Sequence, residues 1–599
     1  MNFSTRREFL KVSALSACAL LISTGLSGCG GSDDDADDTT TPAAFNHGIA
    51  SGDPLSDKVI IWTRVTTTAP TINVNYEVAT DEAFADIIHN GIYTTDATKD
   101  YTVKIDIQNL FDGTTYYYRF SSKGTTSDIG KMKTLAVGSL DTLKMAVFSC
   151  ANYPNGYFNP YTEASKLDDL DVTLHLGDYI YEYGLYEDDD FDAKVPAYAT
   201  KNAAAIDRLF PDNNNKECIA LDDYRRRYAL YHTDKGLQAI HKAAPMIPVW
   251  DDHEVANDTY KDNAQNHDDT EGDYQTRVEA ALQAYFEWIP IRPITNKKEI
   301  FRTFDFGDLV SLNMLETRVF GRDKQLEYGD YFTANGDFLA ANFQAAVGDE
   351  NRTMLGDKQL LWLKEAIASS TSTWHVLGQQ VIMGRMNLPA EILISMGKIG
   401  NAAAYGTTEE AVLAEINTAL TEVATIKTRI LNNDTTVTDA EKLRVSTVLP
   451  YNLDAWDGYF VERETIFGTA KAYDKNLVVL AGDTHNSWAN NLKDMGGDSV
   501  GVEFATTSVS SPGMEEYLSL ADDNAAAQLE GALSLLVDDL KYTNLSNRGF
   551  MEVVYTKTEV TTNWHYVQSN ESETYSVNSL RAKSLQCKLN TKNLEAVNI

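Results

Sequence analysis

The spacing of apolar residues changes along the chain and divides it into two parts. Over residues 45–136, short segments that alternate apolar and polar residues are separated by turns rich in Gly, Asp and Thr. This pattern predicts an all-β, immunoglobulin-like sandwich. From residue 142 onward, apolar runs of strand length alternate with helical patterns, for example over residues 224–241 and 274–288. Such alternation is typical of an α/β domain, which we expect to span residues 142–570.

Two further segments differ from these patterns. Residues 392–448 are rich in Ala, Glu, Leu and Lys, which predicts a helical insertion with a helix pair around residues 408–431. One role open to the insertion is to cap a substrate crevice and narrow the range of substrates. Residues 571–599 are polar, and we expect an irregular tail there.

Four apolar runs end on residues that bind metals or move protons. They are residues 145–150 (MAVFSC), 171–181 (DVTLHLGDYIY), 246–254 (MIPVWDDHE) and 477–485 (LVVLAGDTH). In open α/β sheets, ligands bind beyond the carboxyl ends of such strands. The pattern therefore predicts one crevice that collects Cys150, Asp178, Tyr181, Asp252, His253, Asp483 and His485.

These side chains suit a centre with two metals. Carboxylates, imidazole, phenolate and thiolate together form a mixed set of hard and borderline ligands, which fits a transition metal beside an oxygen-seeking cation. Two neighbouring cations repel each other and need a bridging carboxylate. Asp178 is the candidate bridge, because it directly follows a strand and lies three residues before Tyr181.

Each of these residues also has an ordinary explanation when it is taken alone. Cys150 can be a buried thiol, His253 a structural histidine, and the Gly-Asp pairs that contain Asp178 and Asp483 can be simple turns. If all of these ordinary explanations were correct, chance alone would have placed residues of this kind at four separate strand ends. The metal interpretation rests on that joint occurrence.

Several longer motifs occur in a familiar order. They are FNHGIASGDP (45–54), HLGDYIYEYG (175–184), WDDHEV (250–255), MLGDKQLLWL (354–363), DAWDGYFVER (454–463), AGDTHNSW (481–488) and VEFATTSVSSPG (502–513). With these motifs the chain resembles the PhoD-like alkaline phosphatases and phosphodiesterases, a branch of the metallophosphoesterase superfamily. The resemblance implies a layered α/β/β/α sandwich that follows the all-β domain.

The resemblance also implies particular roles for the candidate residues. The site would hold iron(III) and calcium, with Cys150, Asp178 and Tyr181 near the iron. Asp252 would be a metal ligand and His253 the catalytic histidine, and the GDTH motif would supply Asp483 and His485. Arg318 is a candidate phosphate clamp, because its guanidinium can bind two phosphate oxygens. The chain departs from the expected pattern at Glu316, where an aspartate is expected, and at Thr484 and Asn486 beside the ligands.

The expected reaction is the attack of a metal-activated hydroxide on an organic phosphate ester, with small phosphomonoesters or phosphodiesters as substrates. Two alternatives stay open at this point. One is a phosphodiesterase or phospholipase D-like hydrolase. The other is a lipoprotein whose β-domain binds a surface polymer and whose second domain is not catalytic.

The N-terminus has the features of an export signal. Residues 1–28 contain the twin-arginine pair Arg6 and Arg7 and an apolar stretch, and the lipobox Leu26-Ser27-Gly28-Cys29 follows, with cleavage expected before Cys29. A plain signal peptide with an incidental cysteine is the alternative. Residues 29–44 are acidic and polar, which predicts a flexible tether. We therefore expect export by the twin-arginine machinery, a lipid anchor on Cys29, a periplasmic or cell-surface location, and a role in phosphate acquisition.

Composition narrows the remaining possibilities. The formal net charge of −36 excludes the basic surface that nucleic-acid binding needs. With only five cysteines in 599 residues, and with Cys218 and Cys587 far apart, the chain is not a fold built on disulfides.

Overall fold

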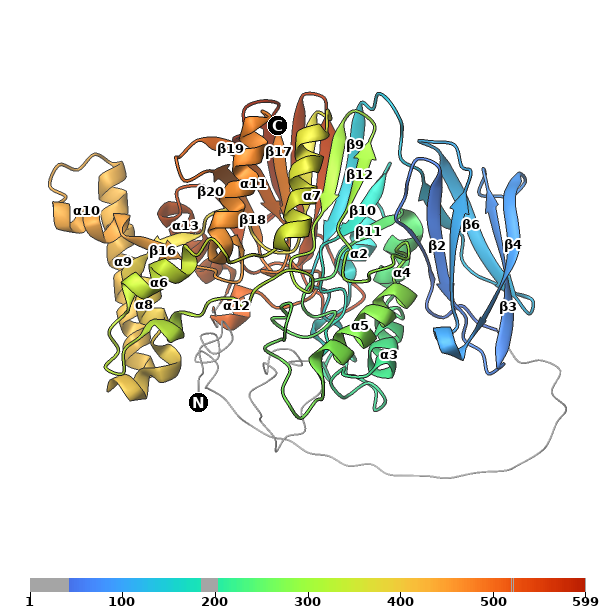
Figure 1. Cartoon of the computed structure of the whole chain (residues 1–599), viewed down its shortest axis with the longest axis horizontal. Coiled ribbons are helices and arrows are strands. Elements are labelled where there is room, and N and C mark those ends of the chain that lie inside the picture. Colours follow the sequence, from blue (N-terminus) through green and yellow to red (C-terminus); the bar gives the residue numbers. More distant parts are fainter. Residues whose placement is uncertain (1–42, 185–202, 519, 521, 598–599) are drawn as a thin grey trace.

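The structure is a computed structural model that describes residues 43–184, 203–518, 520 and 522–597. Its centre consists of two large sheets packed face to face, with helices outside them (Figure 1). The first sheet has ten strands in the order β24-β23-β22-β21-β9-β10-β11-β1-β2-β5. The second has seven, in the order β12-β13-β14-β17-β19-β18-β20.

The N-terminal strands form the predicted all-β sandwich. One of its layers contains β1 (Ile49–Gly52), β2 (Lys58–Arg64) and β5 (Thr102–Gln108). The other contains β3 (Thr71–Ala79), β4 (Ile87–Asp96), β6 (Thr115–Ser122), β7 (Thr125–Thr126) and β8 (Gly130–Lys133). Buried side chains from both layers, such as Val59, Ile61 and Val74, form a core of their own.

This sandwich is joined to the α/β domain through a shared sheet. Strand β1 pairs in parallel with β11 (Met246–Pro248), with Gly52 opposite Met246. A Cβ at Gly52 would lie 2.3 Å from the carbonyl oxygen of Pro290, so the close approach requires glycine here. The sequence pattern did not predict that β1, β2 and β5 extend the ten-stranded sheet.

The rest of the ten-stranded sheet comes from the α/β domain. Strand β9 (Thr142–Phe148) pairs in parallel with β10 (Val172–His175), and β10 with β11. The sheet continues through antiparallel β21 (Gly549–Thr556), β22 (Glu559–Tyr566), β23 (Lys583–Lys588) and β24 (Leu594–Ala596). Helices α2 (Asn159–Ala164), α3 (Leu221–Tyr231), α4 (Lys235–Ala243) and α5 (Tyr274–Trp288) contribute buried side chains to the same core.

The second sheet is mixed: β13, β14, β17 and β19 pair in parallel, and the strands outside them pair antiparallel. Its strands are β12 (Arg302–Phe306), β13 (Val310–Met314), β14 (Trp374–Gly378), β17 (Leu477–Ala481), β18 (Ser487–Lys493), β19 (Ser499–Ala505) and β20 (Leu540–Asn544). Val376 and Val478 belong to the core shared with the first sheet. Their neighbours Leu377 and Val479 belong instead to the core that includes side chains of α7 (Gly356–Ser369) and α11 (Phe460–Ala472). This alternation confirms the layered α/β/β/α architecture.

The prediction of an irregular C-terminal tail is wrong. Residues 583–588 and 594–596 form β23 and β24 at the edge of the ten-stranded sheet. Leu585, Cys587 and Leu594 are buried in the main core. Polar composition misled the prediction, because a strand of an antiparallel sheet with one face toward solvent needs apolar residues on its other face only.

The helical insertion exists, but its helices differ from the expectation. Helix α9 (Glu409–Leu431) is one continuous helix where a pair was predicted, and Thr408 caps its N-terminus. The insertion also contains α8 (Ala390–Met396) and α10 (Asp439–Ser446), and a short ladder between β15 (Asn387–Pro389) and β16 (Val448–Pro450) closes its base. Figure 1 shows it at the end of the molecule opposite the N-terminal sandwich, near α6 (Ala340–Val347) and α13 (Asp523–Leu536).

Three further observations bear on the sequence predictions. Among the described cysteines, Cys150, Cys218 and Cys587 are all buried and free, so none forms a disulfide. Within the described ranges, the structure has no helix with the length and apolar character that crossing a membrane requires. The export signal, the lipobox and most of the tether lie outside the described residues, so those interpretations stay predictions.

Candidate metal centre

The candidate residues meet where the two sheets face each other, beyond the carboxyl ends of β9, β10, β11 and β17. Two sets of side chains bring their ligand atoms within 4.8 Å of one another. The first set is Cys150, Asp178 and His485, and the second is Asp178, Asp252 and His253. All of these side chains are buried, and Asp178 belongs to both sets. The structure therefore brings residues from all four predicted strand ends together.

The backbone turns sharply at these strand ends. Cys150, Asp178, Asp483 and His485 have φ angles of 61°, 55°, 61° and 62°, in the left-handed region that non-glycine residues seldom occupy. Conformations of this kind cost of order 1–3 kcal/mol each and tend to occur at functional sites. The strain supports a functional interpretation of the Gly-Asp pairs over simple turns.

The glycine before Asp178 has a specific packing role. Gly177 has a φ of 102°, and a Cβ on it would lie 2.3 Å from the Cβ of Asp251. Only glycine lets the loop after β10 come this close to the loop after β11. The contact brings the chain segments of Asp178 and Asp252 together.

Tyr181 extends the first set. Its phenol oxygen lies 3.0 Å from Oδ2 of Asp178 and 3.0 Å from Nε2 of His485. The Nδ1 of His485 lies 2.6 Å from the carbonyl oxygen of Pro512, so Nδ1 carries the hydrogen and Nε2 presents its lone pair toward Tyr181. The sulfur of Cys150, the carboxyl group of Asp178, the phenol of Tyr181 and the imidazole of His485 thus meet in one place.

The charges of the centre fit bound cations. Burial, and after it the neighbouring carboxylate of Asp178, raises the pKa of the Cys150 thiol well above its usual value. Burial likewise raises the pKa of Asp178. Within the described residues, the buried atoms Oδ1 of Asp178 and Oδ2 of Asp251 have no hydrogen-bond partner. Cations would offset this burial cost and occupy these acceptors, so the donor set fits metal binding.

His253 is held by a carboxylate that the sequence analysis did not select. Its Nδ1 lies 2.7 Å from Oε2 of Glu182. The other oxygen of Glu182 accepts hydrogen bonds from the backbone of Asn257 at 2.8 Å and from the amide of Asn266 at 2.7 Å. The His253 ring also packs on Tyr181, with ring centroids 4.1 Å apart. These contacts fix the ring and leave Nε2 for chemistry.

Electrostatics favour a protonated His253. Burial by itself lowers the pKa of His253, but the carboxylates of Asp252, Asp178 and Glu182 outweigh it and raise that pKa well above its usual value. An imidazolium can donate a proton to a leaving oxygen. The arrangement is therefore consistent with the predicted catalytic histidine.

Arg318 does not have the geometry of a phosphate clamp. Its side chain is completely buried, and its guanidinium contacts three carboxylates. Nη1 lies 2.9 Å from Asp454 and Nη2 lies 3.1 Å from Asp483, while Nε contacts Asp251. These carboxylates occupy the edges of the guanidinium that would bind phosphate. Arg318 is therefore better placed to hold together the loops of Asp251, Asp454 and Asp483. Asp483 contacts Arg318 and lies outside both metal-capable sets.

Two buried glutamates clamp the loops of the centre. Glu254 accepts backbone hydrogen bonds from Asp178 at 3.1 Å and Asp251 at 2.7 Å, and so joins the loops after β10 and β11. Glu316, found where an aspartate is expected, accepts the backbone N–H groups of Arg318 at 2.9 Å and Val319 at 2.7 Å. The WDDHE motif contains the signal for Glu254, but its partners could not be read from the sequence.

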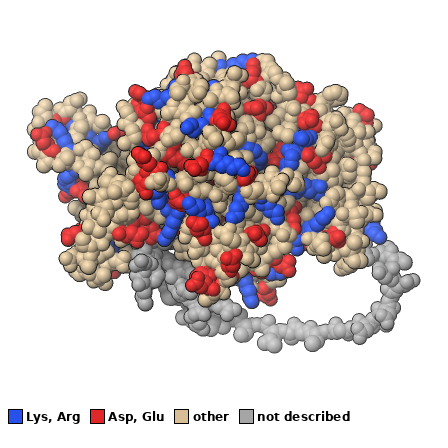
Figure 2. All heavy atoms as spheres, viewed as in Figure 1, with Lys and Arg blue, Asp and Glu red and all other residues tan. Residues whose placement is uncertain are grey.

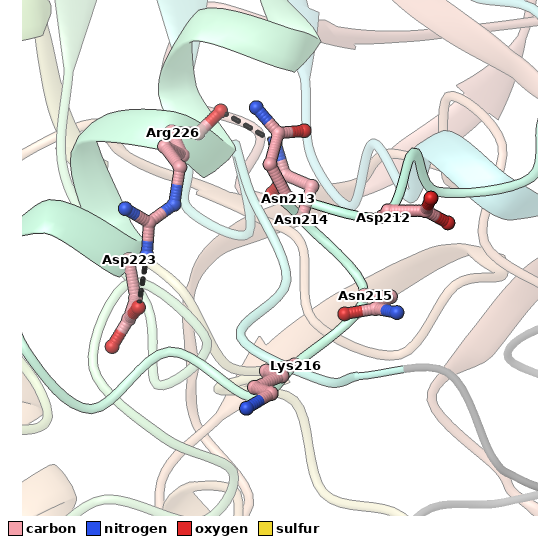
Figure 3. Close-up of a pocket in the computed structure, with 7 residues that line it drawn as sticks. All are labelled: Asp212, Asn213, Asn214, Asn215, Lys216, Asp223 and Arg226. Carbon is pink, nitrogen blue, oxygen red and sulfur yellow. Dashed lines mark hydrogen bonds and ion pairs between the residues drawn. The ribbon is translucent and has the colours of Figure 1, made fainter.

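A separate pocket lies between α3 and the loop before it. Its volume is about 320 Å³, and polar side chains line it (Figure 3): Asp212, Asn213, Asn214, Asn215, Lys216, Asp223 and Arg226. Asn214 donates to the carbonyl of Arg226 at 2.8 Å, and Arg226 pairs with Asp223 at 2.5 Å. None of the predicted site residues lines this pocket.

The charge on the surface is mixed. On the face drawn in Figure 2, Lys and Arg side chains are interspersed with Asp and Glu. The excess of acidic residues therefore does not form one continuous repulsive surface on that face.

Comparisons with known proteins show which family the chain resembles over most of its length. The family model described as PhoD-like phosphatase matches residues 145–564, and the model described as PhoD-like phosphatase, N-terminal domain, matches residues 31–136. Alkaline phosphatase D of Bacillus subtilis (strain 168) is 32% identical over 491 residues, which are 78% of this chain and 70% of that protein. A solved structure of PhoD is 28% identical and covers 94% of both chains with a TM-score of 0.70.

Proposed function

This chain belongs to the PhoD-like phosphatase family and is a phosphoester hydrolase, and we propose that it releases phosphate from organic phosphate esters at the centre built around Asp178. The main support for the proposal is that Asp178 belongs to both sets of side chains that could hold a metal ion. A carboxylate in that position can bridge two cations.

The two sets differ in ligand chemistry. Cys150, Tyr181 and His485 supply sulfur, phenol oxygen and imidazole nitrogen, a mixed set that suits a transition metal such as iron(III), whereas Asp252 supplies carboxylate oxygen, which suits calcium. When bound, the cations would activate a hydroxide and neutralise the charge of the phosphate. The assignment of iron and calcium is part of the proposal.

The residues of the chain have separate tasks in this reaction. Asp178 and Asp252 hold the cationic side of the site, and Glu254 fixes the distance between their loops through backbone hydrogen bonds. His253, oriented by Glu182, donates a proton to the leaving oxygen. Arg318 keeps Asp251 and Asp483 in place from behind the site.

Asp178→Asn tests the proposal most directly. The bridge loses a charge while the side chain keeps its shape, so we expect both metals to fall in metal analysis and turnover of nitrophenyl phosphate to be lost. Glu217→Gln is a suitable control, because it also exchanges a carboxylate for an amide of the same shape, and Glu217 pairs with Arg277 and Asn266 and with none of the proposed ligands. Full turnover and full metal content in Asp178→Asn would contradict the proposal. A bis(nitrophenyl) phosphate assay on the same preparations separates monoester from diester preference.

We also propose that the enzyme is exported by the twin-arginine route and anchored through lipid on Cys29. The supporting features are Arg6, Arg7 and the lipobox in the sequence. Changing both arginines to lysine should leave protein in the cytoplasm with its leader intact. Cys29→Ser should release the protein from membranes, and its retention in the membrane pellet would contradict the lipid anchor.

A further inference from the structure

Ser511 contacts two of the proposed iron ligands. It follows β19, its side chain is completely buried, and its hydroxyl oxygen lies 2.7 Å from the phenol oxygen of Tyr181. The same hydroxyl lies 3.0 Å from the backbone carbonyl oxygen of Cys150. Ser511 therefore bridges the phenol of one ligand residue and the backbone of another.

A serine hydroxyl has a single hydrogen and must direct it to one of these two acceptors. The Cys150 carbonyl also accepts the backbone N–H groups of Ser510 at 3.3 Å and Ser511 at 3.2 Å, so it stays satisfied without the hydroxyl. A phenolate is a stronger acceptor than a neutral carbonyl, because charge-assisted hydrogen bonds are about twice as strong. When Tyr181 is deprotonated, the hydrogen goes to its oxygen.

We propose that Ser511 is a positioning residue that holds the Tyr181 phenolate and tunes how strongly it donates electrons to the metal. A hydrogen bond to the phenolate oxygen stabilises its lone pairs and weakens that donation. The energy of the tyrosinate-to-iron charge-transfer transition rises as a result. This inference rests on the iron assignment of the proposed function.

The test compares the visible absorption and iron content of three purified proteins: the wild type, Ser511→Ala and Ser510→Ala. Removal of the Ser511 hydroxyl should move the charge-transfer band to longer wavelength while the iron content stays the same. Ser510→Ala is the matched control, because the Ser510 hydroxyl donates to the carbonyl of Asn152 at 2.8 Å and its change should not move the band. Ser511→Thr keeps a hydroxyl and should restore the wild-type band.

The possible results separate this inference from the proposed function. A wild-type protein without the band overturns the iron–tyrosinate assignment and this inference with it. A wild-type band that does not move in Ser511→Ala overturns the inference alone. Loss of iron from Ser511→Ala also overturns it, because Ser511 would then be needed to hold the metal.

Discussion

Nδ1 of His253 and Oε2 of Glu182 lie 2.7 Å apart, and both side chains are buried. The pair joins the loop after β11 to the loop after β10, immediately beside Tyr181. A carboxylate on Nδ1 fixes the ring orientation and stabilises the protonated form of the imidazole. The proposed proton donor therefore depends on a residue that lies outside both metal-capable sets.

Glu182→Gln should lower kcat about 10- to 100-fold, the range typical of residues that orient a ligand or catalytic group. KM and metal content should change little, because Asp178 and Asp252 are intact. Steady-state kinetics with nitrophenyl phosphate, paired with metal analysis, measure both. Glu217→Gln provides the comparison, since Glu217 shares the partner Asn266 but does not contact His253. Equal losses in the two variants would mean that Glu182 is only structural.

Arg318→Met should destabilise the fold rather than weaken substrate binding. The change removes the guanidinium that contacts Asp251, Asp454 and Asp483, and breaking a buried ion pair costs about 3–5 kcal/mol. Urea unfolding should show this loss. A phosphate clamp predicts a different result, in which KM rises at unchanged stability, and that outcome would restore the original interpretation of Arg318.

Stability should fall as the solution becomes acidic, because histidines are buried in neutral form behind the site. Burial lowers the pKa of His241 to about 3, and burial followed by the charge of His241 lowers the pKa of His175 to about 3. Below the ordinary value of 6.5, the unfolded chain binds protons that the folded chain does not. Each such histidine therefore costs about 1.4 kcal/mol per pH unit as the pH drops from 6.5 toward 3.

His241→Gln tests this pH dependence. Glutamine can still contact the Tyr179 hydroxyl, which lies 2.6 Å from Nε2 of His241, but it does not titrate. The decline in unfolding free energy between pH 6.5 and pH 5 should be shallower in this variant. A slope that is the same in His241→Gln and the wild type would contradict the assignment.

The strand-end residues could be predicted because each follows an apolar run directly, so local sequence carries the signal. The residues that orient these side chains could not be predicted from local sequence. Glu182 and His253 are 71 positions apart, and Ser511 and Tyr181 are 330 apart, so only the packed sheets bring them together. The partners of Arg318 could not be predicted either. Its guanidinium can bind phosphate or carboxylates, and only the structure shows which of these groups lie beside it. The pairing of β1 with β11 likewise depends on a contact between distant segments.

Leu585→Ala should destabilise the enzyme, although it lies in a segment whose composition resembles a loose tail. Leu585 is 4% exposed on β23 and packs in the main core, where a leucine-to-alanine change costs about 2–5 kcal/mol. Lys583→Ala, on the same strand but half-buried, should change stability by about 0.5 kcal/mol or less. Thermal and urea unfolding compare the two variants.

If both variants are as stable as the wild type, β23 does not contribute to the core. If only Leu585→Ala unfolds early, the C-terminal strands are part of the domain that supports the metal centre, because β22 and β21 connect β23 to β9 and the loop of Cys150.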